Sequence, residues 1–273
     1  MNIGIIGQGF VGNAVYKKFI NFFNVLTYDI NQKLCNSTLE IIKKQCNVIF
    51  VCVPTPMNVD GDCDISIVES VIAEFSDLGD KIIINKSTIV PGTTEFFNDK
   101  YKKIQVLFNP EFLTERNAVY DYENQKRIIL GGPRPATTIV KNIFTTVFPK
   151  ARIIKTGSRH AEMIKYFTNA FLATKVSFAN EIYDLCLKLE LDYDKVVEYT
   201  TEDERIGNTH LNVPGPDGDL GFGGHCFPKD LSALINLTEK HKSVNNLLKS
   251  VKLTNDKIRK NRDWEKMKGR AIN

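Results

Sequence analysis

The sequence of 273 residues predicts an α/β fold, with a doubly wound sheet in its N-terminal part and a long central helix followed by a helical domain. Short apolar segments alternate with segments of helical periodicity through the first half of the chain. A glycine-rich turn, GQGFVG at residues 7–12, joins the first expected strand to the first expected helix. From residue 161 to residue 189 apolar residues recur at helical spacing. We therefore divide the chain into residues 1–156 and residues 157–273.

Three glycines of this turn, Gly7, Gly9 and Gly12, have the Gly-x-Gly-x-x-Gly spacing of dinucleotide-binding loops. Such glycines permit a tight turn, close approach of a pyrophosphate to the backbone and close helix–strand packing. A chance tight turn is the alternative, but the second expected strand ends in an acidic residue, Asp29, as a nucleotide site requires. Asp29 can accept hydrogen bonds from the ribose and would repel a 2′-phosphate, which favours NAD over NADP, although nearby Lys33 weakens that preference. The N-terminal domain is therefore expected to be a Rossmann-type NAD-binding domain.

Further buried strands follow the first two, and polar residues stand at their ends. The expected apolar segments are residues 47–53, 81–85, 104–112 and 127–132, with a helix over 64–79. Ligands of doubly wound sheets bind at the carboxyl ends of the strands. Thr55, Thr88 and the Asn-Pro-Glu-Phe turn at 109–112 fall at such ends. Each alone is typical of a surface turn, but together they predict one crevice beside the cofactor.

The composition excludes several classes of protein. The net charge of +4 shows no basic face of the kind that nucleic-acid binding requires. The six cysteines include no Cys-x-x-Cys pair, so neither a zinc ribbon nor a thioredoxin motif is expected, and we predict no metal site. No apolar run is long enough for a membrane span, and the N-terminus lacks the features of a signal peptide. We expect a protein of the reducing cytoplasm, without nucleic-acid or membrane partners.

Two features of the second domain carry candidate chemistry. Lys165 and Asn169 are four residues apart on the long expected helix, so they share a face. A solvated stripe is the usual interpretation, whereas in a cleft such a lysine can act as a base or an oxyanion donor. Cys226 lies in GFGGHCFPKD, residues 221–230, just before a helix that Pro228 opens. A buried core cysteine is the alternative to a reactive thiol at this position.

The surroundings of Cys226 favour the reactive thiol. The following helix N-terminus and Lys229 both favour the thiolate, which is the nucleophilic form. The preceding glycines leave room for a bulky substrate, and Asp230 can hold a water or a lysine in the first helical turn. A thiol beside an NAD site suits oxidation of an aldehyde to an acid through a thioester. A lysine and a carboxylate would let the same site oxidise the alcohol first, with four electrons passing to two NAD molecules.

Seven segments together resemble those of one family. They are GQGFVG (7–12), VPTP (53–56), KSTIVPGT (86–93), NPEFLTE (109–115), AEMIKYFTNAFLATKVSFANE (161–181), RIGN (205–208) and GFGGHCFPKD (221–230). The chain resembles the UDP-glucose/GDP-mannose dehydrogenase family, and within it the UDP-glucose 6-dehydrogenases. The resemblance implies NAD-dependent oxidation of the C6 hydroxyl of UDP-glucose to UDP-glucuronate, in polysaccharide biosynthesis.

The resemblance also implies residue roles. Cys226 would form the thiohemiacetal and thioester, and Lys165 with Asp230 and a water would handle the first proton. Lys165 and Asn169 would stabilise the oxyanion, while Glu111 would assist hydrolysis with a water ordered by Thr88. The implied cofactor-binding residues are Gly7, Gln8, Gly9, Phe10, Val11, Gly12, Asp29, Lys33, Thr55, Pro56, Thr88, Glu115 and Lys229, the last two at the nicotinamide end. The implied substrate-binding residues are Phe112, Leu113, Lys165, Asn169, Arg205, Phe222 and Gly223.

The resemblance further implies a homodimer built around the long helix, with Arg205 reaching the substrate of the neighbouring subunit. Members usually carry a third, UDP-binding domain after the central helices, so we expect either a naturally short form or a fragment. Three alternatives remain open from the sequence. They are a dehydrogenase of GDP-mannose or a UDP-N-acetylhexosamine, a two-electron β-hydroxyacid dehydrogenase, and a non-catalytic NAD or nucleotide-sugar binding protein. The Cys226 loop argues against the second. The retained Lys165, Asn169, Cys226 and Asp230 argue against the third, whereas the expected lack of the UDP-binding domain favours it.

Overall fold

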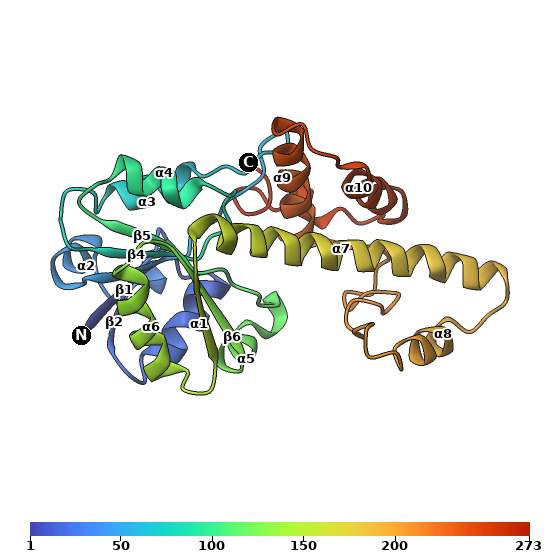
Figure 1. Ribbon diagram of the computed structural model, residues 1–273, viewed down its shortest axis with the longest axis horizontal. Helices are drawn as coiled ribbons and strands as arrows, with labels where there is room; N and C mark the ends of the chain where they lie inside the picture. Colours follow the sequence, from blue (N-terminus) through green and yellow to red (C-terminus); the bar gives the residue numbers. More distant parts are fainter. The chain divides into compact units, whose positions relative to one another are not determined.

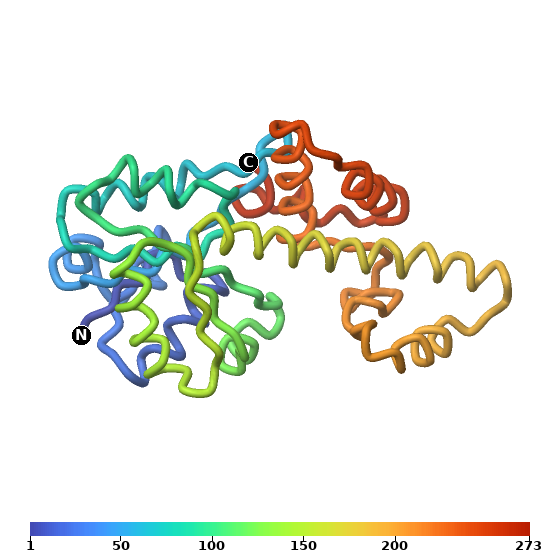
Figure 2. The backbone as a smooth tube through the Cα atoms, in the orientation of Figure 1, coloured from blue at the N-terminus to red at the C-terminus, as the bar shows by residue number.

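The structure is a computed structural model that describes residues 1–273. The chain folds into two compact units. The first contains residues Met1–Thr55 and Asp64–Lys165, and the second contains Pro56–Cys63 and Tyr166–Asn273. The helix α7, Ser158–Lys188, begins in the first unit and continues through the second. Figures 1 and 2 trace the chain through both units.

The first unit is built on one seven-stranded sheet in the order β2-β1-β3-β4-β5-β6-β7. Its strands are β1 Asn2–Ile6, β2 Asn24–Tyr28, β3 Val48–Val51, β4 Ile82–Asn85, β5 Gln105–Phe108, β6 Arg127–Gly131 and β7 Arg152–Thr156. All neighbouring strands are parallel except β5 and β6. This confirms the predicted doubly wound α/β fold. The four strands expected from apolar segments beyond β2 are all present but shorter, because their flanking residues turn away from the ladder.

Helices cover both faces of this sheet (Figure 1). They are α1 Phe10–Phe19, α2 Leu39–Gln45, α3 Ser66–Ala73, α4 Thr93–Lys100, α5 Ala118–Glu123 and α6 Ala136–Val147, with 3-10 turns η1 Gln32–Leu34 and η2 Glu115–Asn117. One face packs on α1, α5 and α6, where Phe19, Phe50 and Phe144 meet edge to face. The other face packs on α2, α3 and α4. Because both faces are covered, β3 and β4 are buried at every residue, as parallel strands require.

The second unit is helical, as predicted for the C-terminal part of the chain. Besides α7 it contains α8 Tyr193–Thr200, α9 Phe227–Lys240, α10 Asn246–Ile258 and the 3-10 turn η3 Asp263–Lys266. Tyr193 of α8 packs on α7 and donates a hydrogen bond to the carbonyl of Leu211 at 2.7 Å. Segment 56–63 lies beside the C-terminus (Figure 2), where the Met57 amide donates to the carbonyl of Ala271 at 2.8 Å. No helix combines the length and the hydropathy that crossing a membrane would require.

Candidate active site

The glycine turn at the start of α1 has the geometry of a phosphate cradle. Gly7 adopts a φ of 90°, and a Cβ there would lie 2.5 Å from the carbonyl oxygen of Cys52. A Cβ on Gly12 would lie 1.9 Å from the carbonyl oxygen of Gly7. Helix α1 can therefore pack this closely against the turn only because residue 12 is a glycine. Gly9 borders open space, since its Cβ position has no heavy atom within 4 Å. The N-terminus of α1 is therefore open to an anionic ligand.

A cavity of about 520 Å³ adjoins this turn. Four residues expected to bind cofactor line it: Gln8, Gly9, Phe10 and Lys33. Asp29, at the end of β2, accepts a hydrogen bond from the Gln8 amide at 2.6 Å and one from the Asn31 amide at 2.8 Å. The carboxylate is thereby fixed against the glycine turn. The size of the cavity, the open helix N-terminus and the fixed carboxylate fit the adenosine and pyrophosphate of a dinucleotide.

Six further residues line this cavity and were not predicted from the sequence: Asn13, Tyr16, Thr27, Leu34, Cys35 and Asn36. The Cys35 thiol accepts a hydrogen bond from the Asp29 amide at 3.0 Å and donates one to the Asp29 carbonyl at 3.1 Å. Asn36 accepts from the Thr27 amide at 2.7 Å, which ties the loop back to β2. The only signal in the sequence for Cys35 and Asn36 was their position in the polar loop that follows β2, the strand leading to Asp29.

Replacing Asp29 by alanine is expected to weaken NAD binding by about 10- to 100-fold, because charge-assisted hydrogen bonds to the ribose are lost. The preference for NAD over NADP should shrink as well, since the carboxylate no longer repels a 2′-phosphate. Calorimetric titration of both cofactors measures this. Asp99→Ala removes an exposed carboxylate of α4 that pairs with Lys102 and serves as the control. An unchanged ratio of the two affinities would show that Asp29 does not select the cofactor.

Glu111 and Lys165 form a buried ion pair in the first unit. The Lys165 Nζ lies 2.8 Å from Glu111 Oε1 and donates to the Glu111 carbonyl at 2.7 Å. The side chain of Lys165 is 3% exposed and that of Glu111 is 7% exposed. Lys165 therefore does not lie on a solvated stripe of the helix. Burial alone would raise the pKa of Glu111, but Lys165 and the Leu113 amide, which donates to Oε2 at 2.9 Å, lower it overall. Phe112 adds its ring, whose centroid is 5.6 Å from the Lys165 Nζ.

A second buried lysine, Lys86, was not identified as a site residue from the sequence. It follows β4 and donates hydrogen bonds to the Oδ1 and the carbonyl oxygen of Asn109, at 2.8 Å and 3.4 Å. Asn109 in turn donates to the carbonyl of Ile129 at 2.8 Å. Burial lowers the pKa of Lys86 to about 8. Lys86 thus fixes the turn that leads into Glu111.

The remaining expected residues of the first unit lie in different surroundings. Thr55 and Thr88, at the ends of strands, are buried. Val11 belongs to the first turn of α1. Glu115 lies exposed in η2, and Pro56 opens the segment that belongs to the second unit.

Cys226 is the N-cap residue of α9, as the sequence predicted, and it is partly exposed rather than buried in a core. In the following turn Asp230 is 1% exposed and lies between two donors. Its Oδ1 lies 2.6 Å from the Lys229 Nζ, and its Oδ2 accepts from the Asn169 amide nitrogen at 2.6 Å. Burial alone would lower the pKa of Lys229, but Asp230, Cys63 and Cys226 raise it overall. Asp230 therefore holds a lysine, the second of its two predicted roles.

The expected substrate residues of the second unit divide into two groups. Phe222 is buried and precedes Gly223 in the Cys226 loop. Arg205 lies on the surface after α8, with a side chain 88% exposed and paired with Asp203. Arg205 is thus exposed to solvent, whereas Phe222 is buried. The structure contains no group of three or more His, Cys, Asp or Glu side chains that could hold a metal ion.

Sequence profiles of one family match both halves of the chain. The NAD binding domain of the UDP-glucose/GDP-mannose dehydrogenase family matches residues 30–148, and the central domain of that family matches residues 159–257. The chain belongs to the UDP-glucose/GDP-mannose dehydrogenase family. NAD is therefore the cofactor of the first unit, in agreement with the glycine turn and the cavity beside it.

Individual members of the dehydrogenase family show the same relationship. The chain is 35% identical over 223 residues to the UDP-glucose 6-dehydrogenase TuaD of Bacillus subtilis, covering 78% of this chain and 47% of TuaD. It is 36% identical over 225 residues to the UDP-glucose 6-dehydrogenase of Pseudomonas aeruginosa, covering 76% and 48%. The chain thus spans about half the length of these curated relatives.

Solved structures agree in fold. The UDP-glucose dehydrogenase of Pyrobaculum islandicum superposes with a TM-score of 0.85 at 28% identity, over 94% of this chain and 68% of that one. A UDP-D-ManNAc dehydrogenase from Pyrococcus horikoshii gives 0.81 at 23% identity, over 94% and 69%, and supports the fold alone.

Proposed function

We propose that this chain catalyses the NAD-dependent, four-electron oxidation of the C6 hydroxyl of UDP-glucose to UDP-glucuronate. The observation that carries the proposal is Cys226, a partly exposed thiol at the N-terminus of α9, next to the buried array of Lys229, Asp230 and Asn169. Hydride transfer alone needs no nucleophile, whereas oxidation of an aldehyde to an acid does. Bound NAD accepts the hydrides.

Cys226 has the covalent role in this proposal. Its sulfur adds to the aldehyde carbon, and after oxidation of the adduct the carbon remains attached to sulfur as a thioester. Water then breaks the carbon–sulfur bond, which releases the carboxylic acid and returns the thiol. The positive N-terminal end of the α9 dipole stabilises the thiolate, both when the sulfur attacks the aldehyde and when it leaves the thioester. Two hydrides leave per sugar, so each turnover consumes two NAD molecules and one water.

The buried polar residues supply proton transfer and charge stabilisation. Lys165 is held by Glu111, so its ammonium is fixed in position before substrate arrives. We assign it, with Asp230 and a water, to removal of the hydroxyl proton, and with Asn169 to stabilisation of the oxyanion. Glu111, kept ionised by Lys165, is the base that activates water for thioester hydrolysis, and Thr88 orders that water.

A dehydrogenase of another nucleotide sugar is the second candidate. The structure of the Pyrococcus horikoshii UDP-D-ManNAc dehydrogenase shares this fold over 94% of the chain. The chemistry would be unchanged, because the roles assigned above concern the oxidised carbon with its oxygens and the attacking water, and not the rest of the sugar nucleotide.

A panel of UDP-glucose, GDP-mannose, UDP-N-acetylglucosamine and UDP-N-acetylmannosamine tests the proposal, with NADH formation followed by its absorbance at about 340 nm. UDP-glucose is expected to give the highest kcat/KM. A folded protein that binds NAD but forms no NADH with any of the four sugars would contradict the proposal and favour a non-catalytic binding protein.

We further propose a homodimer, with Arg205 reaching the substrate of the neighbouring subunit. An apolar stripe of Phe167, Phe171, Phe178 and Leu185 lies along one face of α7, and each is at least 50% exposed. A stripe of this kind on a long helix needs a partner helix, and a second copy supplies a matching one. Arg205 is exposed and available to that copy.

The double substitution Phe171→Glu/Phe178→Glu is expected to convert the dimer to a monomer, because each of the two copies would bury two carboxylates in the interface. Light scattering coupled to size exclusion measures the mass. Phe22→Glu, at an exposed phenylalanine outside α7, is the control and should leave the mass unchanged. A wild-type protein that is monomeric at all concentrations, or a variant that remains dimeric, would contradict an interface on this face.

The six cysteines are all free of disulfides. Because a nucleophilic thiol must stay reduced to act, we place the protein in the cytoplasm. Synthesis of UDP-glucuronate would serve polysaccharide biosynthesis.

A further inference from the structure

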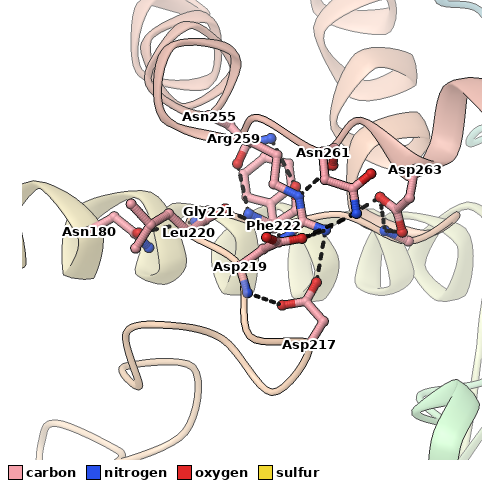
Figure 3. Close-up of polar contacts among 11 residues, drawn as sticks. Asn180, Asp217, Asp219, Leu220, Gly221, Phe222, Asn255, Arg259, Asn261 and Asp263 are labelled. Carbon is pink, nitrogen blue, oxygen red and sulfur yellow. Dashed lines mark hydrogen bonds and ion pairs between the residues drawn. The ribbon is translucent and has the colours of Figure 1, made fainter.

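The loop that precedes Cys226 is fixed by side chains rather than by secondary structure. The amide of Gly221 donates to Asn180 Oδ1 at 3.0 Å, and that of Phe222 donates to Asn255 Oδ1 at 2.7 Å. The amide of Gly224 donates to both carboxylate oxygens of Asp263 at 3.1 Å. Figure 3 shows these side chains converging on the loop from α7, from α10 and from the start of η3. The backbone amides of Gly221, Phe222 and Gly224 are thus each held by a different side chain from outside the loop.

Arg259 lies at the centre of this arrangement (Figure 3). Its side chain is only 1% exposed, although it carries a full charge. Its Nη2 lies 2.8 Å from Asp217 Oδ2 and 3.5 Å from both Asp219 Oδ2 and Asp263 Oδ1. The other nitrogens donate to carbonyls, Nε to Asn261 at 2.8 Å and Nη1 to Leu220 at 3.5 Å. The Arg259 guanidinium therefore links Asp217, Asp219 and Leu220 of the loop to the segment after α10 that contains Asn261 and Asp263.

The positive charge of Arg259 offsets the mutual repulsion of the three carboxylates that surround it. Without Arg259, the carboxylates of Asp217, Asp219 and Asp263 would repel one another, and the Nη1 donor to the Leu220 carbonyl would be lost. A lysine cannot replace the planar fork, because an ammonium is a point charge on a flexible stem. The arrangement is thus specific for arginine.

The glycines of the loop serve this anchor. A Cβ on Gly223 would lie 2.4 Å from Arg259 Nη2 and 2.4 Å from Asp263 Oδ1. A Cβ on Gly221 would lie 2.4 Å from Asn255 Oδ1. At Gly221 and Gly223 packing is thus a second reason for glycine beside the predicted room for a substrate, whereas a Cβ on Gly224 would meet no heavy atom within 4 Å. Glycine is required at both positions because the anchoring side chains pack directly against the backbone.

We propose that Arg259 is a positioning residue, which fixes loop 217–224 through Asp217, Leu220 and Asp263 and so holds Cys226 at the N-terminus of α9. Its importance for turnover rests on the proposed function, in which Cys226 is the nucleophile. Arg259 itself touches no substrate. It acts by removing the freedom of the loop before the sugar carbon arrives, so that the thiol needs no reorganisation at the moment of addition.

The test compares Arg259→Gln and Arg259→Lys with a matched control. Arg262→Gln removes a nearby arginine that pairs with Asp256 and Glu265 and has no bond to the loop. Because Arg259 is buried, Asp263→Ala provides a second route to the same effect, since it removes the acceptor of the Gly224 amide at a partly exposed position. Hydrogen exchange of the peptide spanning residues 217–226, read by mass spectrometry, reports the loop without depending on activity.

In the wild type and in Arg262→Gln the amides of this peptide should exchange slowly. In Arg259→Gln and Asp263→Ala they should exchange at least about tenfold faster, while peptides of α9 and α10 keep their protection. With UDP-glucose, Arg259→Gln should lower kcat by about 100-fold with KM for NAD unchanged, and Arg259→Lys should recover only a small part. Unchanged exchange of the loop in both Arg259→Gln and Asp263→Ala, or faster exchange with unchanged kcat, would overturn the proposal. If the wild type forms no NADH, the proposed function fails, while the exchange measurement still decides whether Arg259 holds the loop.

Discussion

Replacing Cys226 by serine is expected to lower formation of the acid by about 10³-fold or more, the scale seen when a covalent nucleophile is removed. Serine has nearly the same shape, but its hydroxyl is far less acidic than a thiol, so the adduct with the aldehyde does not form efficiently. The first oxidation does not use the nucleophile and should continue. The variant is therefore expected to stop at the aldehyde.

Chromatography of the sugar nucleotides, with a carbonyl-trapping reagent, measures this outcome. Cys46→Ala is the matched control, because burial raises the pKa of Cys46 to about 11 and makes that thiol inert. The control should form acid at the wild-type rate. If Cys226→Ser forms acid as fast as the wild type, the thiol has no covalent role.

Replacing Lys165 by methionine is expected to lower the free energy of unfolding by about 3 kcal/mol and kcat by about 10²- to 10⁴-fold. Glu111 would remain buried without the ammonium that now lies 2.8 Å away. The loss in rate follows from the loss of the proposed proton-transfer group and oxyanion donor. The matched control is Lys188→Met, on the same helix, whose exposed pair with Asp184 should contribute no more than about 0.5 kcal/mol.

The difference in the free energy of unfolding between Lys165→Met and the wild type should depend on pH, because it depends on the ionisation of Glu111. In the wild type its pKa is lowered below the unfolded value, so its contribution is present above the unfolded pKa and is lost as the pH falls through the folded pKa. In Lys165→Met the main opposition to burial is lost and only the Leu113 amide and Lys86 still lower the pKa of Glu111, so that pKa should rise and ionised Glu111 should destabilise the fold at higher pH. Urea titrations at about pH 8 and about pH 5 should therefore show the larger difference between variant and wild type at the higher value. An equal difference at both would contradict the buried pair as its cause.

The fold was predictable because local signals and tertiary structure agree. The glycine turn, the fully buried strands and the 31-residue helix α7 were identified from periodicity and spacing. The expected helix over 64–79 is shorter, Ser66–Ala73, because the chain turns into bends before β4. The last strand, β7, was not identified, since Arg152–Thr156 alternates only weakly between buried and exposed residues.

The candidate site was predictable where motifs are compact and not where contacts are long-range. Cys226 and Asp230 could be identified, because both lie within a few residues of one helix start. The partners of Arg259 could not, since Asp217 and Asp219 precede it by about 40 residues and lie in a loop without regular structure. Lys86 was missed for the same reason, because only the folded chain brings it to Asn109.

In the proposed reaction one site removes four electrons from a sugar nucleotide through a Cys226 thioester. The most direct test is the amount of NADH formed when a limiting, known quantity of UDP-glucose is consumed completely in the presence of excess NAD. The proposed reaction yields two NADH and one UDP-glucuronate for each UDP-glucose. One NADH for each sugar with an aldehyde product, or no NADH from a folded protein that binds NAD, would contradict it.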